Sequence, residues 1–151
     1  MQTETSNIQK DENTQDVVFY ILKSDDPASL DRFIAKLCQK ILKEQRQCDI
    51  RLPDEPSMQR LDRALWGYKP ESFIVHGLQN QCPAPIQLWT NEPNSRFNDI
   101  LLNLHPEFPA PYRQFRRTIE VLDQSAALIE RGRQRWKHYK QQGITPTLHK
   151  L

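Results

Sequence analysis

Six consecutive apolar residues at 17–22, most of them β-branched or aromatic, constrain the fold more than any other stretch of the chain. A run of this length and type is typical of a strand buried on both faces. The polar residues at 24–27 end the run, since Asp26 suits a helix N-cap and Pro27 suits the first helical position. Apolar residues then recur at helical spacing, which predicts a helix over 28–45.

Strands and helices continue to alternate along the chain. A short strand is expected at 48–52, less buried than the first because charged Asp49 and Arg51 alternate with apolar residues. The remaining strands are expected at 73–75, 86–89, 100–104 (a short helix is the alternative there) and 118–122, which we expect to be the last strand. Further helices are expected around 58–66 and over about 124–142. This order predicts an α/β fold: a single three-layer domain with a mostly parallel sheet and helices on its faces.

Charge is distributed unevenly along the chain. Residues 1–16 hold two apolar side chains and a net charge of −3, which predicts a disordered acidic N-terminal tail before a domain over 17–151. The net charge is −1 over 17–110 and +6 over 111–151. Because a positive field attracts anions, the partner is expected to be acidic and to dock near the C-terminus.

Several function classes lack their sequence signals. No stretch approaches the roughly 18 apolar residues of a membrane span, and three cysteines without paired spacing indicate a reduced, cytoplasmic protein. The chain has four glycines and no glycine-rich phosphate loop, and its histidines lack metal-ligand spacing. We therefore expect no cofactor, no metal and no catalytic residue. A hydrolase or nuclease whose site is assembled only by folding stays an alternative.

The last helix carries a candidate site. Arg133, Lys137 and Lys140 follow the spacing i, i+4, i+7 and form one basic stripe, while Trp136 and Tyr139 belong to a neighbouring apolar stripe. A basic row beside an aromatic edge suits an acidic peptide with a hydrophobic anchor. Two alternatives remain: a solvated face without a ligand, and direct binding of single-stranded nucleic acid.

Two adjoining segments resemble a known family. Residues 61–66 read LDRALW and residues 70–76 read PESFIVH. This resembles the signature of the chi subunit family of bacterial DNA polymerase III, an L-D-x-A-L-W run followed by E-S-F-hydrophobic-Pro-His. The opening strand, residues 98–104 and residues 133–140 also match, so the resemblance covers about 17–145 in order. It implies a mononucleotide-binding-like sheet without a phosphate loop.

The resemblance also implies a function. The chain would be a non-catalytic accessory subunit of the DNA polymerase III holoenzyme, in which the psi subunit joins it to the clamp loader. It would bind the acidic C-terminal tail of single-stranded DNA-binding protein, so that its contact with DNA is indirect. Carried over by position, the tail site comprises Arg133, Trp136, Lys137 and Lys140, with Leu122 on its apolar floor. Trp136 and Lys140 replace the family's usual Tyr and Arg, and Lys lacks the planar fork that suits a carboxylate.

A second partner surface is implied around the signature itself. Trp66 and Phe73 would face psi or a helicase-like partner, and ordinary core packing is the alternative for each. His76 is expected to make structural hydrogen bonds. Val75 stands where the family usually has Pro, so the partner-facing loop is expected to differ here.

Overall fold

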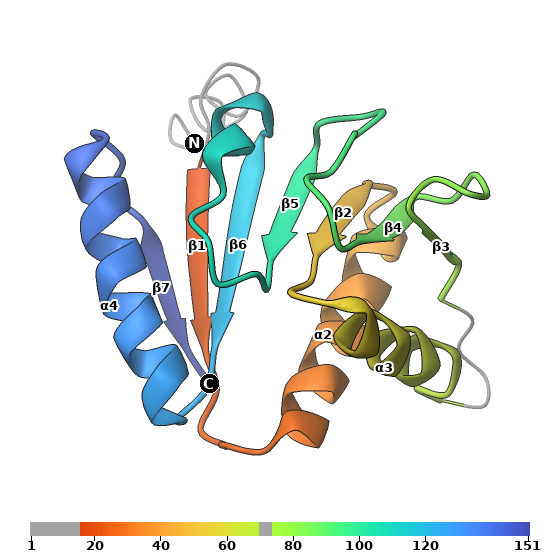
Figure 1. The fold of residues 1–151 in the computed structure, drawn as a ribbon, viewed down its shortest axis with the longest axis horizontal. Coiled ribbons are helices and arrows are strands. Elements are labelled where there is room, and N and C mark those ends of the chain that lie inside the picture. Colours follow the sequence, from red (N-terminus) through yellow and green to blue (C-terminus); the bar gives the residue numbers. More distant parts are fainter. Residues whose placement is uncertain (1–15, 70–73) are drawn as a thin grey trace, which may run out of the picture.

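The computed structural model describes residues 16–69 and 74–151, and these form one sheet with helices on both faces (Figure 1). Within these residues the seven strands are ordered β3-β4-β2-β5-β6-β1-β7, and all neighbours pair in parallel. The strands are β1 (Asp16–Ile21), β2 (Cys48–Arg51), β3 (His76–Leu78), β4 (Ile86–Trp89), β5 (Ile100–Asn103), β6 (Arg117–Leu122) and β7 (Thr147–Lys150). The helices are α2 (Pro27–Lys43), α3 (Glu55–Trp66) and α4 (Ala126–Gln141), with a short 3-10 helix, η1 (Ala110–Gln114). The predicted three-layer α/β domain is confirmed.

The opening strand and helix form as the sequence predicts. Asp26 caps α2 by accepting a hydrogen bond of 2.9 Å from the Ser29 backbone N–H, and Pro27 is the first helical residue. β1 lies between β6 and β7, and its side chains alternate between the two faces of the sheet. Phe19 packs toward α4, whereas Tyr20 packs toward α2.

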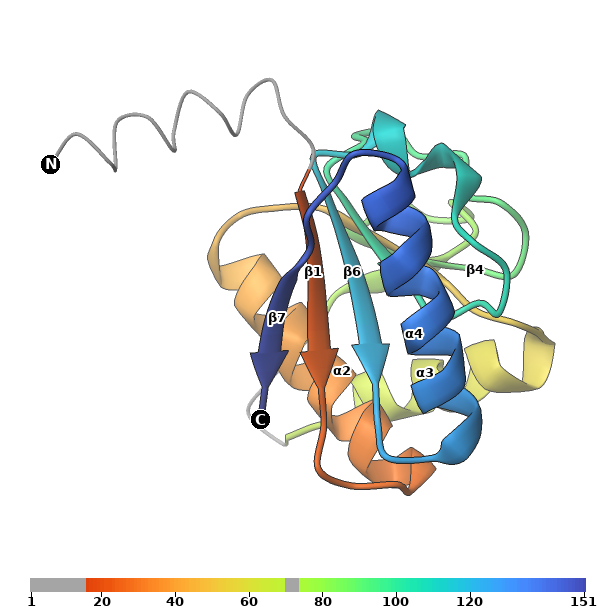
Figure 2. The same cartoon turned by 90° about the vertical axis from the view of Figure 1, so that its left-hand side faces the viewer.

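Two hydrophobic cores fill the space between the layers. The larger lies between the sheet and the α2–α3 pair and includes Ile34, Ile50 and Leu65. The smaller lies between the sheet and α4 and is rich in aromatic residues such as Phe115 and Tyr139. Figure 2 shows α2 and α4 on opposite sides of the sheet. No described helix has the length and apolar character needed to cross a membrane.

The prediction that β2 is less buried than β1 was wrong. All four β2 residues are buried, because β2 is an inner strand between β4 and β5. Asp49 accepts a hydrogen bond of 2.8 Å from the Trp89 indole N–H, and Arg51 pairs with Glu107 at 3.2 Å. The charged residues of β2 therefore bond to other parts of the protein: Asp49 to the buried Trp89, and Arg51 to Glu107, which is exposed at the surface.

A further ion pair ties the loops at the amino ends of β2 and β5. Arg46 Nη2 lies 2.6 Å from Asp99 Oδ1, and the Gln47 backbone N–H donates to the same carboxylate at 3.1 Å. Burial on its own would raise the pKa of Asp99. The bonds from Arg46 and Gln47 and the charge of Arg46 outweigh burial, so the pKa of Asp99 lies below its ordinary value.

Two strand predictions need correction. Instead of a strand at 73–75, β3 begins at His76, and Phe73 lies outside the described residues, as do residues 1–15 of the expected tail. The strand at 118–122 is not the last. After α4, Gly143 adopts a φ of 87° that turns the chain, and β7 then pairs in parallel with β1 (Figure 2). β7 escaped prediction because its sequence, Thr-Leu-His-Lys, has one apolar residue and all four residues are exposed.

Candidate functional site

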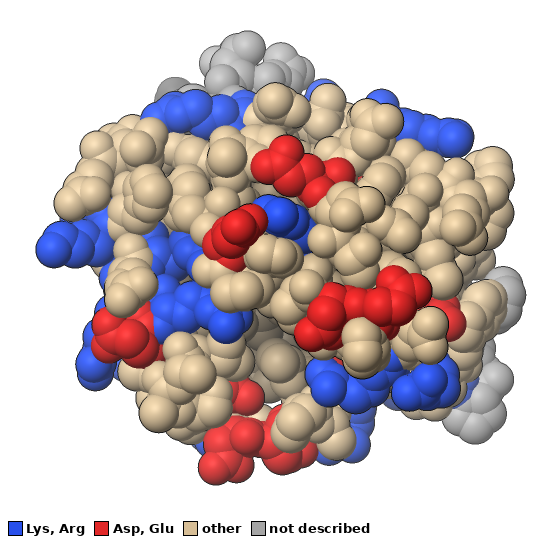
Figure 3. All heavy atoms as spheres, in the orientation of Figure 1, with Lys and Arg blue, Asp and Glu red and all other residues tan. Residues whose placement is uncertain are grey.

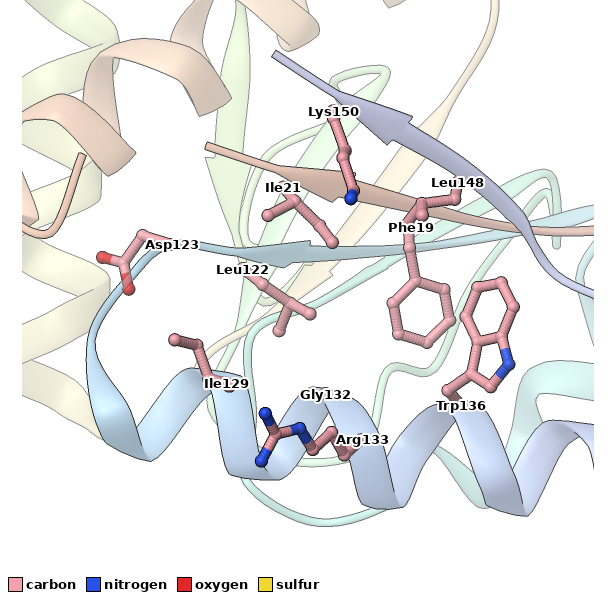
Figure 4. A pocket seen from close by; sticks show the side chains of 10 residues that line it. All are labelled: Phe19, Ile21, Leu122, Asp123, Ile129, Gly132, Arg133, Trp136, Leu148 and Lys150. Atoms are coloured by element: carbon pink, nitrogen blue, oxygen red, sulfur yellow. The ribbon is translucent and has the colours of Figure 1, made fainter. Parts of the chain in front are cut away.

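A pocket of about 520 Å³ opens between α4 and the β1–β7 side of the sheet (Figure 4). Its lining consists mostly of apolar side chains, with one cationic side chain on each of two opposite sides (Figure 4). The sheet contributes Phe19, Ile21, Leu122, Leu148 and Lys150, the turn before α4 contributes Asp123, and α4 contributes Ile129, Gly132, Arg133 and Trp136.

Gly132 sets how closely α4 approaches the sheet. A Cβ atom at this position would clash with Cδ1 of Leu122 on β6. Because glycine leaves that space empty, Leu122 lies directly beneath the helix and forms the pocket floor. The face of β7 beyond it is not covered by α4, and Leu148 remains 42% exposed.

A buried polar network fixes the rotation of α4. Arg135 Nη1 donates to both carboxylate oxygens of Glu120 on β6 at 3.2 Å, and its Nη2 donates to the Pro106 carbonyl at 2.7 Å. The Tyr139 hydroxyl donates to Glu120 Oε2 at 2.8 Å. Burial raises the pKa of Tyr139, and the adjacent Glu120 carboxylate raises it further, so the hydroxyl keeps its proton. Burial also raises the pKa of Glu120, against the opposing effect of Arg135.

The network leaves three other basic residues of α4 pointing away from the core. Arg133, Lys137 and Lys140 are exposed, and Figure 3 shows Lys and Arg atoms across the α4 side of the molecule. Arg133 lines the pocket, but Lys137 and Lys140 do not. The Trp136 ring packs edge-on against Phe19, with 5.2 Å between ring centroids.

The structure thus brings together three of the five predicted tail-site residues, Arg133, Trp136 and Leu122, around one pocket. Sequence reasoning missed Phe19 and Lys150. The alternation of β1 shows that Phe19 and Tyr20 face opposite sides of the sheet, but only the structure shows that Phe19 is on the α4 side, where it shares a core with Tyr139.

The pocket has an electrostatic bias toward anions. Among the described residues, neither Arg133 nor Lys150 forms an ion pair with a carboxylate. The single acidic group of the lining, Asp123, is buried and accepts hydrogen bonds from the Ser125 backbone N–H and hydroxyl at 3.0 and 2.7 Å. These hydrogen bonds hold the Asp123 carboxylate at the start of α4, and neither cation of the lining pairs with it.

The signature region forms a separate surface. Trp66 ends α3 and is 50% exposed, which contradicts core packing, and its ring lies 4.6 Å from the His76 ring. His76 is buried, with Nε2 2.6 Å from Asp62 Oδ1 and Nδ1 2.8 Å from the Ile74 carbonyl. The predicted hydrogen bonds of His76 are therefore present. Phe73, the second expected partner residue, is not among the residues described.

Comparison with known proteins identifies the family. The family model described as DNA polymerase III chi subunit, HolC, matches residues 15–147. The chain belongs to this chi subunit family. The chi subunit of Pseudomonas aeruginosa is 30% identical over 136 residues, which cover 89% of this chain and 96% of the relative. Those of Haemophilus influenzae and Escherichia coli are 28% and 26% identical, over 83% and 86% of this chain and 90% and 94% of the relatives.

Chi family membership makes the chain an accessory subunit of the DNA polymerase III complex, which acts in DNA replication. The described residues contain no cluster of three or more His, Cys, Asp or Glu side chains that could hold a metal ion.

Proposed function

We propose that this chi-family chain is a non-catalytic cytoplasmic adaptor between the clamp loader, reached through psi, and the acidic C-terminal tail of single-stranded DNA-binding protein. The observation that carries the proposal is the apolar pocket of about 520 Å³ with Arg133 on one side and Lys150 on the other. An acidic peptide that ends in an aromatic residue has the two features that such a pocket selects.

The chemistry of the pocket matches that ligand part by part. A phenyl ring between Phe19, Leu122 and Trp136 gains roughly 1.5–3 kcal/mol from burial. A carboxylate held by Arg133 or Lys150 gains a charge-assisted hydrogen bond of about 1.5–3 kcal/mol. Acidic residues farther along the peptide lie near Lys137 and Lys140, the exposed cations of α4 outside the pocket.

Psi binds at the separate surface around Trp66. An exposed tryptophan at the end of a helix has the character of an interface hot spot, and its ring is held in place by His76. A helicase-like partner that competes with psi is expected to use the same surface. Trp66→Ala therefore weakens titrated binding of psi and leaves tail binding unchanged.

The test of the tail site is fluorescence-anisotropy binding of a labelled acidic peptide that ends in Pro-Phe. Arg133→Ala is expected to weaken binding about tenfold or more, because one charge-assisted bond is lost. Lys137→Ala, outside the pocket, is expected to lower peptide affinity by a smaller factor. Arg63→Ala, an exposed cation on α3, is the matched control and binds normally.

A peptide without its terminal Phe is the second control. If the shortened peptide binds as well as the full one, the pocket is not the site and the adaptor proposal fails. Direct binding of single-stranded nucleic acid by Lys137 and Lys140 is then favoured, since both are exposed outside the pocket. Such binding falls steeply with salt.

A further inference from the structure

β7 leaves one edge of the sheet open beside the pocket. It is the terminal strand in the order of the described sheet, and all four of its residues are exposed. The Leu151 backbone N–H donates to the Ile21 carbonyl on β1 at 3.0 Å. Because backbone groups alternate in direction along a strand, those of His149 and Thr147 also point toward β1. The N–H and C=O groups of Leu148 and Lys150 therefore point outward, away from the sheet.

The open edge and the pocket share the same two residues. The side chains of Leu148 and Lys150 line the pocket on the α4 face. The intervening His149 points to the other face, where its ring stacks on Tyr20 with 5.2 Å between centroids. A chain that lies along the outer side of β7 thus meets backbone groups that pair with no other described strand, and it meets the pocket at the same time.

The edge is protected against general pairing but not against an acidic chain. Natural sheets block their edges with short strands, proline, bulges or charges, including charges that point inward. β7 is four residues long and its Lys150 turns toward the pocket, but it has a regular register with β1 and no proline within it. Leu148 and Leu151, the residue after β7, are 42% and 44% exposed, and an acidic occupant would compensate the charge of Lys150.

We propose that the acidic peptide bound in the pocket also pairs its main chain with the outer edge of β7, as an additional strand of the sheet. The inference rests on the proposed function and adds how the peptide is held. A strand added about 4.8 Å beyond β7 places every second side chain on the α4 face, within reach of the pocket for an aromatic ring. The cations Arg133 and Lys150 on that face favour an acidic chain as the occupant.

The first test is an N-methyl scan of the same Pro-Phe peptide by anisotropy. N-methylation removes one main-chain donor at a time and leaves the side chains intact. Strand pairing predicts alternation: every second position near β7 loses about fivefold or more in affinity, and the positions between them change little.

The second test acts on the protein. Leu148→Pro removes one outward N–H, and proline is tolerated on an edge strand where the N–H faces solvent. We expect Leu148→Pro to bind the peptide several-fold more weakly than Leu148→Ala, which keeps the N–H. In amide hydrogen exchange, the Leu148 and Lys150 amides slow when the peptide saturates the protein, while the Leu151 amide is slow throughout.

The outcomes separate this inference from the proposed function. If binding needs the terminal Phe but the N-methyl scan shows no alternation and exchange at Leu148 and Lys150 is unchanged, strand pairing is refuted and the pocket remains the peptide site. Absence of Phe-dependent binding removes both. Protection of the two amides that grows with protein concentration, without peptide, shows that a second copy of the chain occupies the edge and also overturns the proposal.

Discussion

Replacement of Arg135 by Met takes the cation out of a buried ion pair and leaves its partner in place. The side chains of Arg135 and Glu120 are 5% and 4% exposed. The variant loses the two 3.2 Å bonds to Glu120 and the 2.7 Å bond to the Pro106 carbonyl. Tyr139 and Asn103 still donate to Glu120, but neither neutralises its charge. An uncompensated buried charge costs about 3–5 kcal/mol.

That cost is a large share of the roughly 5–15 kcal/mol by which a domain is stable. Urea unfolding at pH 7, followed by far-ultraviolet circular dichroism, measures it as a lower midpoint with an unchanged slope. The double variant Arg135→Met with Glu120→Gln removes both charges and is expected to recover most of the loss. Arg133→Met, an exposed neighbour on the same helix, changes stability by less than about 0.5 kcal/mol.

Two results would refute this reasoning about α4. If the stability of Arg135→Met lies within about 1 kcal/mol of wild type, Glu120 does not depend on its cation. If the double variant is no more stable than the single variant, the cost arises from packing around Met rather than from the unpaired carboxylate.

Three further predictions follow from other contacts. Gly132→Ala gains about 1 kcal/mol of helix propensity, which partly offsets about 1–3 kcal/mol lost by overpacking against Leu122. Because Leu122 lies in the pocket floor, peptide affinity is expected to fall more than the free energy of unfolding in urea. Asp99→Asn is expected to lower the free energy of unfolding by about 1–3 kcal/mol at pH 7. Because folding lowers the pKa of Asp99, the difference from wild type shrinks as the pH falls below 3.8. Urea unfolding at pH 7 and at pH 3 measures this change. A thiol reagent labels Cys82, which is exposed, in the folded protein and the other two cysteines only in urea, since both are buried and burial raises the pKa of Cys38 to about 12.

Local signals predicted the parts of the fold that local chemistry determines. β1 follows from its apolar run, and the start of α2 follows from Asp26 and Pro27, because a buried strand and a capped helix each need only neighbouring residues. The burial of Asp49 and Arg51 did not follow, since their partners Trp89 and Glu107 are 40 and 56 residues away. An alternation of charged and apolar residues looks the same whether the charged side chains face water or bond to distant parts of the chain.

The candidate site was predictable to the extent that it lies on one helix. Helical spacing and the family resemblance placed Arg133 and Trp136, and the structure brings both to the pocket. Phe19 and Lys150 contribute from two strands that are neighbours only through the order of the sheet. No local pattern shows that order, because a parallel partner can be anywhere in the chain.

The position of β1 between β6 and β7 also has a consequence for synthesis on the ribosome. β1 is made early, but Asp16 and its partner Arg117 are 101 residues apart, and β7 comes later still. At about 5–20 residues per second, the apolar strand waits roughly 5–20 s for its first neighbour. During that interval the nascent chain presents residues 17–22 to other chains and to chaperones, so its yield should depend on the rate of translation more than that of a domain built from local contacts.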